Sequence, residues 1–202
     1  MQISATILSF RNLHDHGPLF QNFFAERRQT FIAEKHWPMP EEDGLEFDQY
    51  DTPQSRWVAV HREGEHEVLG GFRLTRSTAR CGIYSYMIRD ACLGLLPSIP
   101  KGLIASDEPP VDPGIWECSR GFVVSRLPAA SRKLVRRFTL EQMLPAMERL
   151  GGHGMVVMTT KFWTRWMPMH GIEGRALGPA VDVDGEGYHA VMMCRPAFAS
   201  VA

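Results

Sequence analysis

Residues 115–160 read IWECSRGFVVSRLPAASRKLVRRFTLEQMLPAMERLGGHGMVVMTT, and this stretch decides the fold class. Its first part, residues 115–125, is apolar enough to indicate a strand. Residues 129–150 then predict a long amphipathic helix, which ends at Gly151 and Gly152. The apolar run at 155–160 predicts a second, buried strand. A strand, a helix and a strand in this order favour an α/β fold.

The rest of the chain supplies further regular elements and two long loops. Strands are predicted at 3–10, 56–62, 67–76 and 188–194, and helices at 18–35 and 162–167. Loops are predicted at 38–55, which is rich in proline, acid and glycine, and at 97–114, which is proline-rich. The sum is an α/β three-layer sandwich with a mixed central sheet, an order that resembles the N-acetyltransferase (GNAT-like) acyltransferases.

Bulk composition limits the classes of function. The chain has 202 residues, of which 44% are hydrophobic, and it is expected to form a single domain over residues 1–202. Lys and Arg number 22 against 23 Asp and Glu, so the net charge of -1 gives no reason to expect nucleic acid or membrane as partners.

Cysteine and histidine usage points in the same direction. The four cysteines lack CxxC spacing and the N-terminus lacks a secretory pattern, so we expect reduced thiols in a cytoplasmic protein. The eight histidines show no metal-ligand spacing, so no metal site is expected.

Charged residues occur where a purely structural chain does not need them. Arg73 lies within an apolar predicted strand, and Glu117 and Arg120 lie within another. Alternation along a strand places Glu117 and Arg120 on opposite faces unless a bulge intervenes, so a bulge is predicted here. For any one such residue, an exposed ion pair is an equally good explanation.

Taken together, these residues form a longer pattern. It runs Arg27-x3-Phe31-x5-Trp37, Glu46-Phe47-Asp48-Gln49-Tyr50-Asp51, Gly70-Gly71-Phe72-Arg73-Leu74 and Trp116-Glu117-Cys118-Ser119-Arg120. The pattern resembles the signature of the acyl-homoserine-lactone (autoinducer) synthases and covers most of the chain. One departure is Met87, where the family commonly has an aromatic residue, and another is a longer segment before Glu117; both concern the acyl side of the site.

The resemblance implies an activity and its substrates. The enzyme would transfer an acyl group from acyl carrier protein or acyl-coenzyme A to the amine of S-adenosylmethionine, which is a substrate and not a cofactor. Lactonisation with release of methylthioadenosine would follow, giving a quorum-sensing signal. No cofactor is implied.

The site residues follow from what S-adenosylmethionine carries, namely a sulfonium, an amine, a carboxylate and an adenine. Trp37 is expected to contact the adenine or the sulfonium, or else to be a core tryptophan. Glu117 is expected to accept the amine proton, or else to form an ion pair, and Arg120 to bind the carboxylate or the thioester oxygen. The expected catalytic residues are Glu117, Arg120, Asp48 and Arg73, and the expected S-adenosylmethionine site is Arg27, Phe31, Trp37, Asp48, Asp51 and Arg120.

The acyl donor should meet two further groups of residues. An acyl pocket is predicted at Met87, Val157, Met158, Thr159, Phe162 and Trp163, where core packing is the alternative. A docking surface for an acidic carrier protein is predicted at Arg132, Lys133, Arg136 and Arg137, where a solvated helix face is the alternative. The segment before this helix lacks the glycine-rich loop that cradles the coenzyme A pyrophosphate in ordinary acetyltransferases, which favours a carrier protein.

Two other functions remain open at this point. One is a GNAT-type N-acyltransferase that uses acyl-coenzyme A on another amine. The other is a non-catalytic ligand-binding relative, against which the complete set of acids and arginines argues.

Overall fold

The computed structural model describes residues 1–106 and 108–195, which fall into two compact units. The first unit comprises residues 1–74 and 120–146, and the second comprises residues 75–119 and 147–202. The chain passes from one unit to the other after Leu74, Ser119 and Ala146, each time inside a regular element, so no linker joins the units. The single domain expected over the whole chain stays a prediction.

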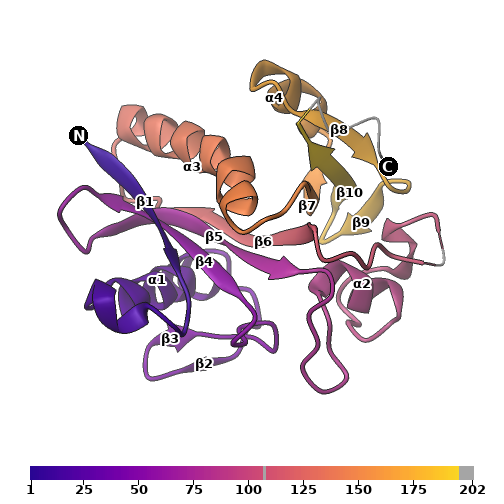
Figure 1. The fold of residues 1–202 in the computed structure, drawn as a ribbon, viewed down its shortest axis with the longest axis horizontal. Helices are drawn as coiled ribbons and strands as arrows, with labels where there is room; N and C mark the ends of the chain where they lie inside the picture. The colour runs from indigo at the N-terminus through magenta and orange to yellow at the C-terminus, as the bar shows by residue number, and fades with distance from the viewer. Residues whose placement is uncertain (107, 196–202) are drawn as a thin grey trace. The chain divides into compact units, whose positions relative to one another are not determined.

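The strands of the first unit come from three separate parts of the sequence (Figure 1). They are β1 (Ile3–Leu8), β4 (Arg56–Arg62), β5 (Val68–Arg76) and the second half of β6 (Ile115–Val123). β1 and β5 both pair antiparallel with β4, and just after β6 the Val124 amide donates to the Leu69 carbonyl at 3.0 Å. The strands predicted at 3–10, 56–62, 67–76 and 115–125 are therefore all present.

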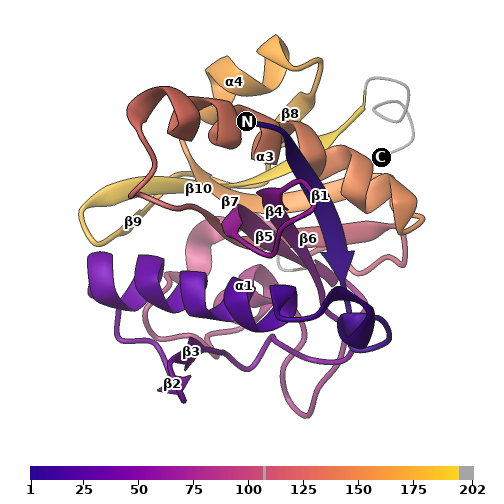
Figure 2. The ribbon, with the colours of Figure 1, turned by 90° about the vertical axis from the view of Figure 1, so that its left-hand side faces the viewer.

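Two helices cover opposite faces of these strands, α1 (Leu19–Arg28) and α3 (Ala129–Arg149) (Figures 1 and 2). Adjacent glycines explain how they approach so closely. A Cβ atom on Gly71 would lie 2.6 Å from a ring carbon of Phe23 on α1, whereas one on Gly70 would lie 3.4 Å from the Thr139 hydroxyl on α3. Neighbouring strand residues face opposite sides, so the helices lie on either side of the strands. The predicted layering of helix, sheet and helix is confirmed in this unit.

Aromatic side chains fill the core of the first unit. Phe23 and Phe24 of α1 and Trp57 of β4 are fully buried, and Phe24 and Trp57 meet edge to face with ring centroids 5.5 Å apart. Aromatic pairs in this geometry add to the stabilisation from area burial alone. The core therefore holds α1 firmly against β4, which positions the charged residues at the end of that helix.

Two details of the first unit differ from the prediction. α1 does not continue as a regular helix to residue 35 but widens into a π-helical turn at Gln29–Glu34. The segment 38–55 is not wholly irregular, because β2 (Glu41–Glu42) and β3 (Leu45–Glu46) pair antiparallel within it. Strands of two residues are too short to produce an alternating pattern in the sequence.

The second unit contains the other half of β6 and the strands that follow α3. β7 (Gly154–Thr160) runs parallel to β6, and β10 (Glu186–Cys194) runs antiparallel to β7. β8 (Glu173–Ala176) and β9 (Val181–Val183) both pair with β10. Because parallel and antiparallel pairs occur together, the predicted mixed sheet is confirmed.

Several short elements of the second unit were not predicted from the sequence. α2 (Met87–Cys92), β8 and β9 were not predicted, while α4 (Trp163–Met169) corresponds to the short helix expected at 162–167. The segment 97–114 was predicted as a surface loop, yet it contains a 3-10 turn at Lys101–Leu103. Leu103 and Ile104 there are buried, so this part of the loop contributes to the core.

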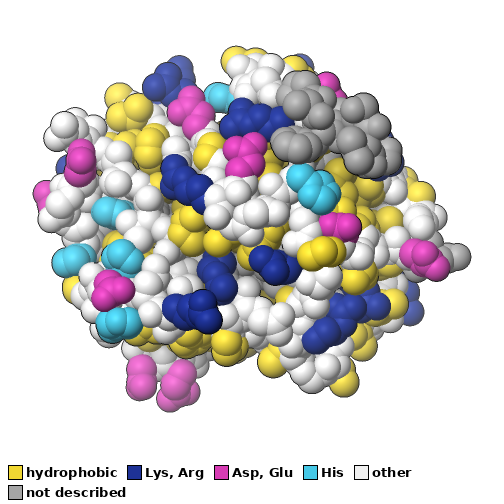
Figure 3. Space-filling model, viewed as in Figure 1, with side chains coloured by type: hydrophobic (Ala, Val, Ile, Leu, Met, Phe, Trp, Pro, Cys, Tyr) yellow, Lys and Arg dark blue, Asp and Glu magenta, His cyan; other side chains and the backbone are white. Residues whose placement is uncertain are grey.

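One face of the molecule (Figure 3) shows how its charged side chains are distributed. On the face drawn in Figure 3, basic and acidic side chains are interspersed, in keeping with a net charge of -1. No helix in the described part of the chain combines the length and the apolar character needed to cross a membrane. The expected absence of nucleic acid and membrane partners stays a prediction.

Candidate active site

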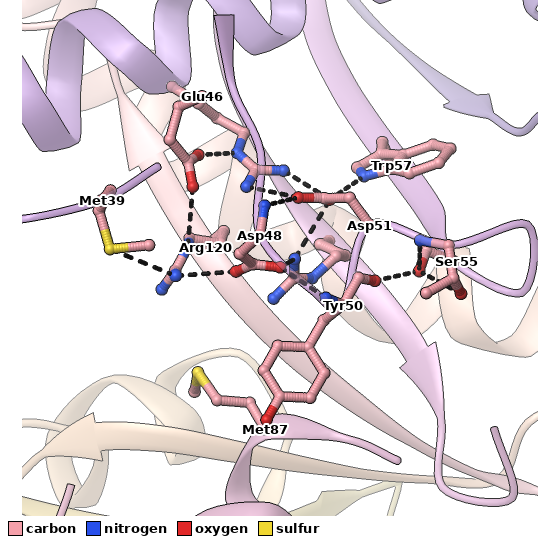
Figure 4. A network of polar contacts seen from close by, with 12 residues as sticks. Met39, Glu46, Asp48, Tyr50, Asp51, Ser55, Trp57, Met87 and Arg120 are labelled. Atoms are coloured by element: carbon pink, nitrogen blue, oxygen red, sulfur yellow. Dashed lines mark hydrogen bonds and ion pairs between the residues drawn. The ribbon is translucent and has the colours of Figure 1, made fainter. Parts of the chain in front are cut away.

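Six charged residues form one network in the first unit, three of them buried and three partly buried (Figure 4). They come from α1, from β3 and the turn after it, from β5 and from β6. The six are Arg27, Glu46, Asp48, Asp51, Arg73 and Arg120.

Arg27 binds two carboxylates from different segments. Its Nε donates to Glu46 Oε2 at 2.5 Å, while Nη1 and Nη2 donate to the two oxygens of Asp51 at 2.8 and 2.9 Å. This side-on pairing with Asp51 uses the planar fork of the guanidinium, which makes both distance and orientation specific. Arg27 therefore ties the end of α1 to the segment 46–51.

Arg73 and Arg120 complete the network from the strands. Arg73 Nη1 donates to Asp48 and lies 3.1 Å from Asp51 Oδ1. Arg120 Nη2 lies 2.8 Å from Asp48 Oδ2, and Arg120 Nε lies 3.6 Å from Glu46 Oε1. Three arginines thus face three carboxylates, so the network is electrically balanced without any substrate.

Burial and pairing act against each other on the carboxylates. Burial by itself would raise the pKa of Asp51, but the charges of Arg73 and Arg27 outweigh it and hold that pKa well below its ordinary value. The pKa of Asp48 is lowered in the same way, by Arg73 and Arg120 against the effect of burial. Both acids are therefore ionised at neutral pH.

Arg120 differs from the other two arginines. Burial lowers its pKa below the ordinary value, because Asp48 and Glu46 offset the loss of water only in part. Its Nε is buried without a hydrogen-bond partner among the described residues, since 3.6 Å to Glu46 is an ion-pair distance and too long for a hydrogen bond. A guanidinium carries five N–H donors, so Arg120 keeps donor capacity for an anionic group.

The backbone at Arg120 breaks the regularity of β6. Its φ is 53°, in the left-handed region that side chains other than glycine rarely adopt. The sequence predicted an irregularity between Glu117 and Arg120, and the left-handed residue supplies one. A non-glycine residue in this conformation is worth about 1–2 kcal/mol of local strain, and such strain is concentrated at functional sites.

An aromatic pair lies beside the network. Phe31, in the π-helical turn, and Trp37 stack with ring centroids 5.2 Å apart and planes within 13°. The Arg120 guanidinium carbon lies 5.8 Å from the Phe31 centroid, and Lys35 Nζ lies 4.7 Å from that of Trp37. Cations therefore already lie against both rings, which shows that these ring faces attract positive charge.

Glu117 belongs to the second unit, where it is fully buried. Its Oε1 accepts a hydrogen bond from the Ile88 amide at 2.7 Å, and its Oε2 accepts one from the Met87 amide at 3.1 Å. Both amides belong to the first turn of α2. Both oxygens of Glu117 thus bind the start of α2, and its expected roles as proton acceptor or ion-pair partner stay predictions.

The predicted acyl-pocket residues all lie in the second unit. Met87 begins α2 and is buried, as is Val157 of β7, whereas Met158 and Thr159 are partly buried and Phe162 is 56% exposed. Thr159 lies directly opposite His189 on β10. The His189 ring centroid lies 6.4 Å from that of Trp163, and neither Trp163 Nε1 nor His189 Nδ1 has a hydrogen-bond partner among the described residues.

The sequence was compared with those of known proteins. An acyl-homoserine-lactone synthase of Pseudomonas aeruginosa is 30% identical over 169 residues, which span 82% of this chain and 74% of that protein. This chain belongs to the acyl-homoserine-lactone synthase family. No protein-family model matches the sequence.

Solved structures show the fold of this acyl-homoserine-lactone synthase family member. A coenzyme A-dependent acyl-homoserine lactone synthase, BjaI, solved with SAM and isopentyl-CoA, superposes with a TM-score of 0.77 at 22% identity, over 98% of this chain and 87% of that one. An acyl-CoA N-acyltransferase from Pseudomonas aeruginosa superposes with a TM-score of 0.55 at 14% identity, over 96% and 99% of the two chains. The predicted family and the predicted GNAT-like fold are both confirmed.

The sequence pattern of this synthase included Glu46 without a site role, and it did not single out Trp57, which binds the network. Glu46 is fully buried and bound to Arg27, and Trp57 Nε1 donates to Asp51 at 2.8 Å. Glu46 could have been inferred, because it lies two residues before Asp48 and alternate residues of an extended chain share a face. Trp57 gave no such signal, since its indole is otherwise a core side chain.

The predicted docking residues of the synthase lie on the first three turns of α3. Arg132 donates to the Ser125 carbonyl at 2.9 Å, and Arg137 forms an ion pair with Glu141 at 3.6 Å. Lys133 and Arg136 are exposed and have no hydrogen bond or ion pair among the described residues. Of the predicted cluster, only Arg137 therefore faces an opposite charge among the described residues. No group of three or more metal-binding side chains occurs in the described part of the chain.

Proposed function

We propose that this protein makes an acyl-homoserine lactone from S-adenosylmethionine and an acyl thioester. The observation that carries the proposal is the balanced network in which Arg120 keeps an unused donor beside the Phe31–Trp37 pair. The amino-acid end of S-adenosylmethionine is itself a zwitterion, so it adds no net charge to a balanced network. Its sulfonium adds one positive charge, which the aromatic faces would stabilise.

In this proposal Arg120 binds the substrate carboxylate through its spare N–H groups. Asp48 accepts hydrogen bonds from the substrate amine, while Arg73, Arg27 and Asp51 hold Asp48 and Arg120 in position through the buried ion pairs. Trp37 and Phe31 lie against the sulfonium or the adenine. Positioning of this kind brings the amine to the thioester and the carboxylate to its own γ-carbon.

The chemistry has two steps. The neutral amine attacks the thioester carbonyl, a C–N bond forms, and the C–S bond breaks to release the thiol, which takes the proton from the amine. The carboxylate oxygen then attacks the γ-carbon of the same molecule, and the bond to the sulfonium sulfur breaks to release methylthioadenosine. The positive charge on sulfur makes it a good leaving group, so the second step depends on folding of the substrate chain.

We propose the region of Met87, Val157, Met158, Thr159, Phe162 and Trp163 as the site of the acyl chain. Buried apolar groups such as Met87 and Val157 suit an alkyl chain. The unpaired Trp163 Nε1 and His189 Nδ1 suit an acyl chain that carries an oxygen. The cytoplasmic location expected from the sequence stays a prediction.

Purified protein, S-adenosylmethionine and a panel of acyl thioesters test the proposed function. Release of methylthioadenosine in step with acyl-homoserine lactone is the expected result. Amide formation on another amine without methylthioadenosine would support an ordinary N-acyltransferase instead. Binding of S-adenosylmethionine without any turnover over the whole panel would indicate a non-catalytic relative.

We propose coenzyme A thioesters as the first donors to assay, because the structural relative BjaI is described with isopentyl-CoA. Carrier-protein donors are tested by reversing two exposed charges that have no hydrogen bond or ion pair among the described residues, Lys133→Glu together with Arg136→Glu. If a carrier docks there, the variant's kcat/KM for acyl carrier protein falls relative to its kcat/KM for acyl-coenzyme A. Added salt then reduces the difference between wild type and variant, because charges are screened over a Debye length of about 8–10 Å. An unchanged ratio of the two specificity constants would identify a solvated helix face.

A further inference from the structure

Two buried carboxylates of the second unit bind the backbone around one short helix. Glu117 accepts hydrogen bonds from the Met87 and Ile88 amides. Asp90 accepts one from the Ser85 amide at 2.8 Å and another from the Ser85 hydroxyl. Both carboxylates are fully buried. Four hydrogen bonds to two carboxylates therefore converge on the start of α2.

α2 needs such partners because it cannot satisfy its own first amides. The initial N–H groups of any helix lack partners within the helix, and a buried donor left unpaired is costly. Tyr86, at the N-cap position, provides no side-chain cap, and its hydroxyl donates instead to the Pro110 carbonyl at 2.8 Å. A helix of six residues is also too short to be stable by itself.

We infer that Glu117 is a positioning residue that holds the first turn of α2, and with it Met87, rather than the base that frees the substrate amine. The inference rests on the proposed function. Both Glu117 oxygens already accept backbone hydrogen bonds, at 2.7 and 3.1 Å. An α-amino group titrates near pH 8, so roughly a tenth of it is neutral at pH 7, and deprotonating it before the attack gains at most about tenfold there.

The inference assigns Glu117 to the acyl side of the reaction. Met87 is buried, and its own backbone amide is one of the two that Glu117 binds. A change at Glu117 therefore moves the backbone that carries this side chain. The S-adenosylmethionine network lies in the first unit and contains its own paired charges, so its affinity should change little.

Glu117→Gln tests the inference, because glutamine keeps the shape but turns an –NH2 group toward a backbone N–H. We expect KM for S-adenosylmethionine to stay within about twofold, KM for the acyl donor to rise at least about fivefold, and the preference between short and long acyl chains to change. The ratio of wild-type to variant kcat should be the same at pH 7 and pH 9, because a displaced Met87 side chain has no ionisable group.

A base role gives the opposite pattern and would overturn the inference. Raising the pH to 9 makes most of the amine neutral without help, so the defect of Glu117→Gln would shrink by up to about tenfold. The acyl KM and the chain preference would then be unchanged.

Asp90→Asn is a parallel test, because it removes the charge of the other carboxylate that binds the start of α2, and Asp90 lies on α2 itself and not on β6. We expect it and Met87→Ala to shift acyl preference as Glu117→Gln does. If Glu117→Gln does not fold, these two variants still test the inference. A changed acyl preference in Met87→Ala together with an unchanged acyl preference in Asp90→Asn would contradict positioning through α2.

Hydrogen exchange separates this inference from the proposed function. In Glu117→Gln, the amides of Met87 and Ile88 should exchange at least about tenfold faster than in the wild type, whatever the enzyme makes. Wild-type protein that releases no methylthioadenosine would refute the proposed function, whereas unchanged exchange at these two amides would refute the holding role of Glu117.

Discussion

The two units bury carboxylates in different ways. In the first unit Glu46, Asp48 and Asp51 face arginines, so one full charge balances another. In the second unit Glu117 and Asp90 face backbone N–H groups, so a charge meets dipoles. Removing a member of the first set leaves an uncompensated charge, whereas removing a member of the second loosens a helix end. The first arrangement suits recognition of a charged substrate, and the second fixes a shape.

The largest effect should follow from deleting a charge of the network. Arg27→Met keeps most of the volume but leaves Glu46 and Asp51 poorly compensated, and we expect the free energy of unfolding to fall by about 3–5 kcal/mol. Urea denaturation measures this. Arg28→Met, one residue further along α1, breaks only the half-exposed pair with Glu41 and should cost less than about 1 kcal/mol. Similar losses in the two variants would mean that the network is not energetically special.

Acid should weaken the network of the first unit. The pKa values of Asp48 and Asp51 are lowered on folding, so below their ordinary value of about 4 the unfolded chain binds more protons than the folded one. Their contribution to stability is therefore complete above about pH 4 and is lost as the pH falls toward the folded pKa values. Asp48→Asn should flatten this acid limb in denaturation curves measured from pH 6 to pH 2. If the free energy of unfolding of Asp48→Asn falls with acid as steeply as that of the wild type, other groups cause the loss of stability.

Arg120→Ala should reduce catalysis more than stability, since the side chain is the least completely paired of the three arginines. We expect kcat/KM to fall at least about tenfold, which corresponds to about 1.4 kcal/mol of barrier. Circular dichroism should show a folded variant. Arg62→Ala, which removes an arginine from a half-exposed pair with Glu67, is the control and should leave the rate unchanged. A folded Arg120→Ala enzyme with the wild-type rate would remove Arg120 from the site.

The smallest effect should come from the aromatic edge of the network. Trp37→Ala is expected to raise KM for S-adenosylmethionine by roughly 2- to 30-fold, the range given by a cation–π contact of about 0.5–2 kcal/mol. KM for the acyl donor should change less, because only S-adenosylmethionine carries a sulfonium and an adenine. Equal effects on both constants would make Trp37 a structural partner of Phe31.

The charged residues and strands of the first unit could largely be predicted from the sequence, whereas the carboxylate–helix contacts of the second unit could not. Arg73 and Arg120 were conspicuous because charge is rare in apolar strands, and β4, β5 and β7 were found from their apolar runs. α2 was missed because its six residues cover less than two helical turns. The contact between Glu117 and the Ile88 amide spans 29 residues and depends on tertiary packing, so no local pattern indicated it.

The way the chain crosses between its units has a consequence for synthesis on the ribosome. The first unit needs residues up to 146 and the second needs residues beyond them, so a nascent chain completes neither until α3 has emerged. A chain that ends at Ser119 contains Glu46, Asp48 and Asp51 but only Arg27 and Arg73, and its network carries one excess negative charge. Arg120 restores neutrality in the next residue added. Limited proteolysis of chains truncated at 119 and at 146 should therefore find protection of residues 1–74 only in the longer one.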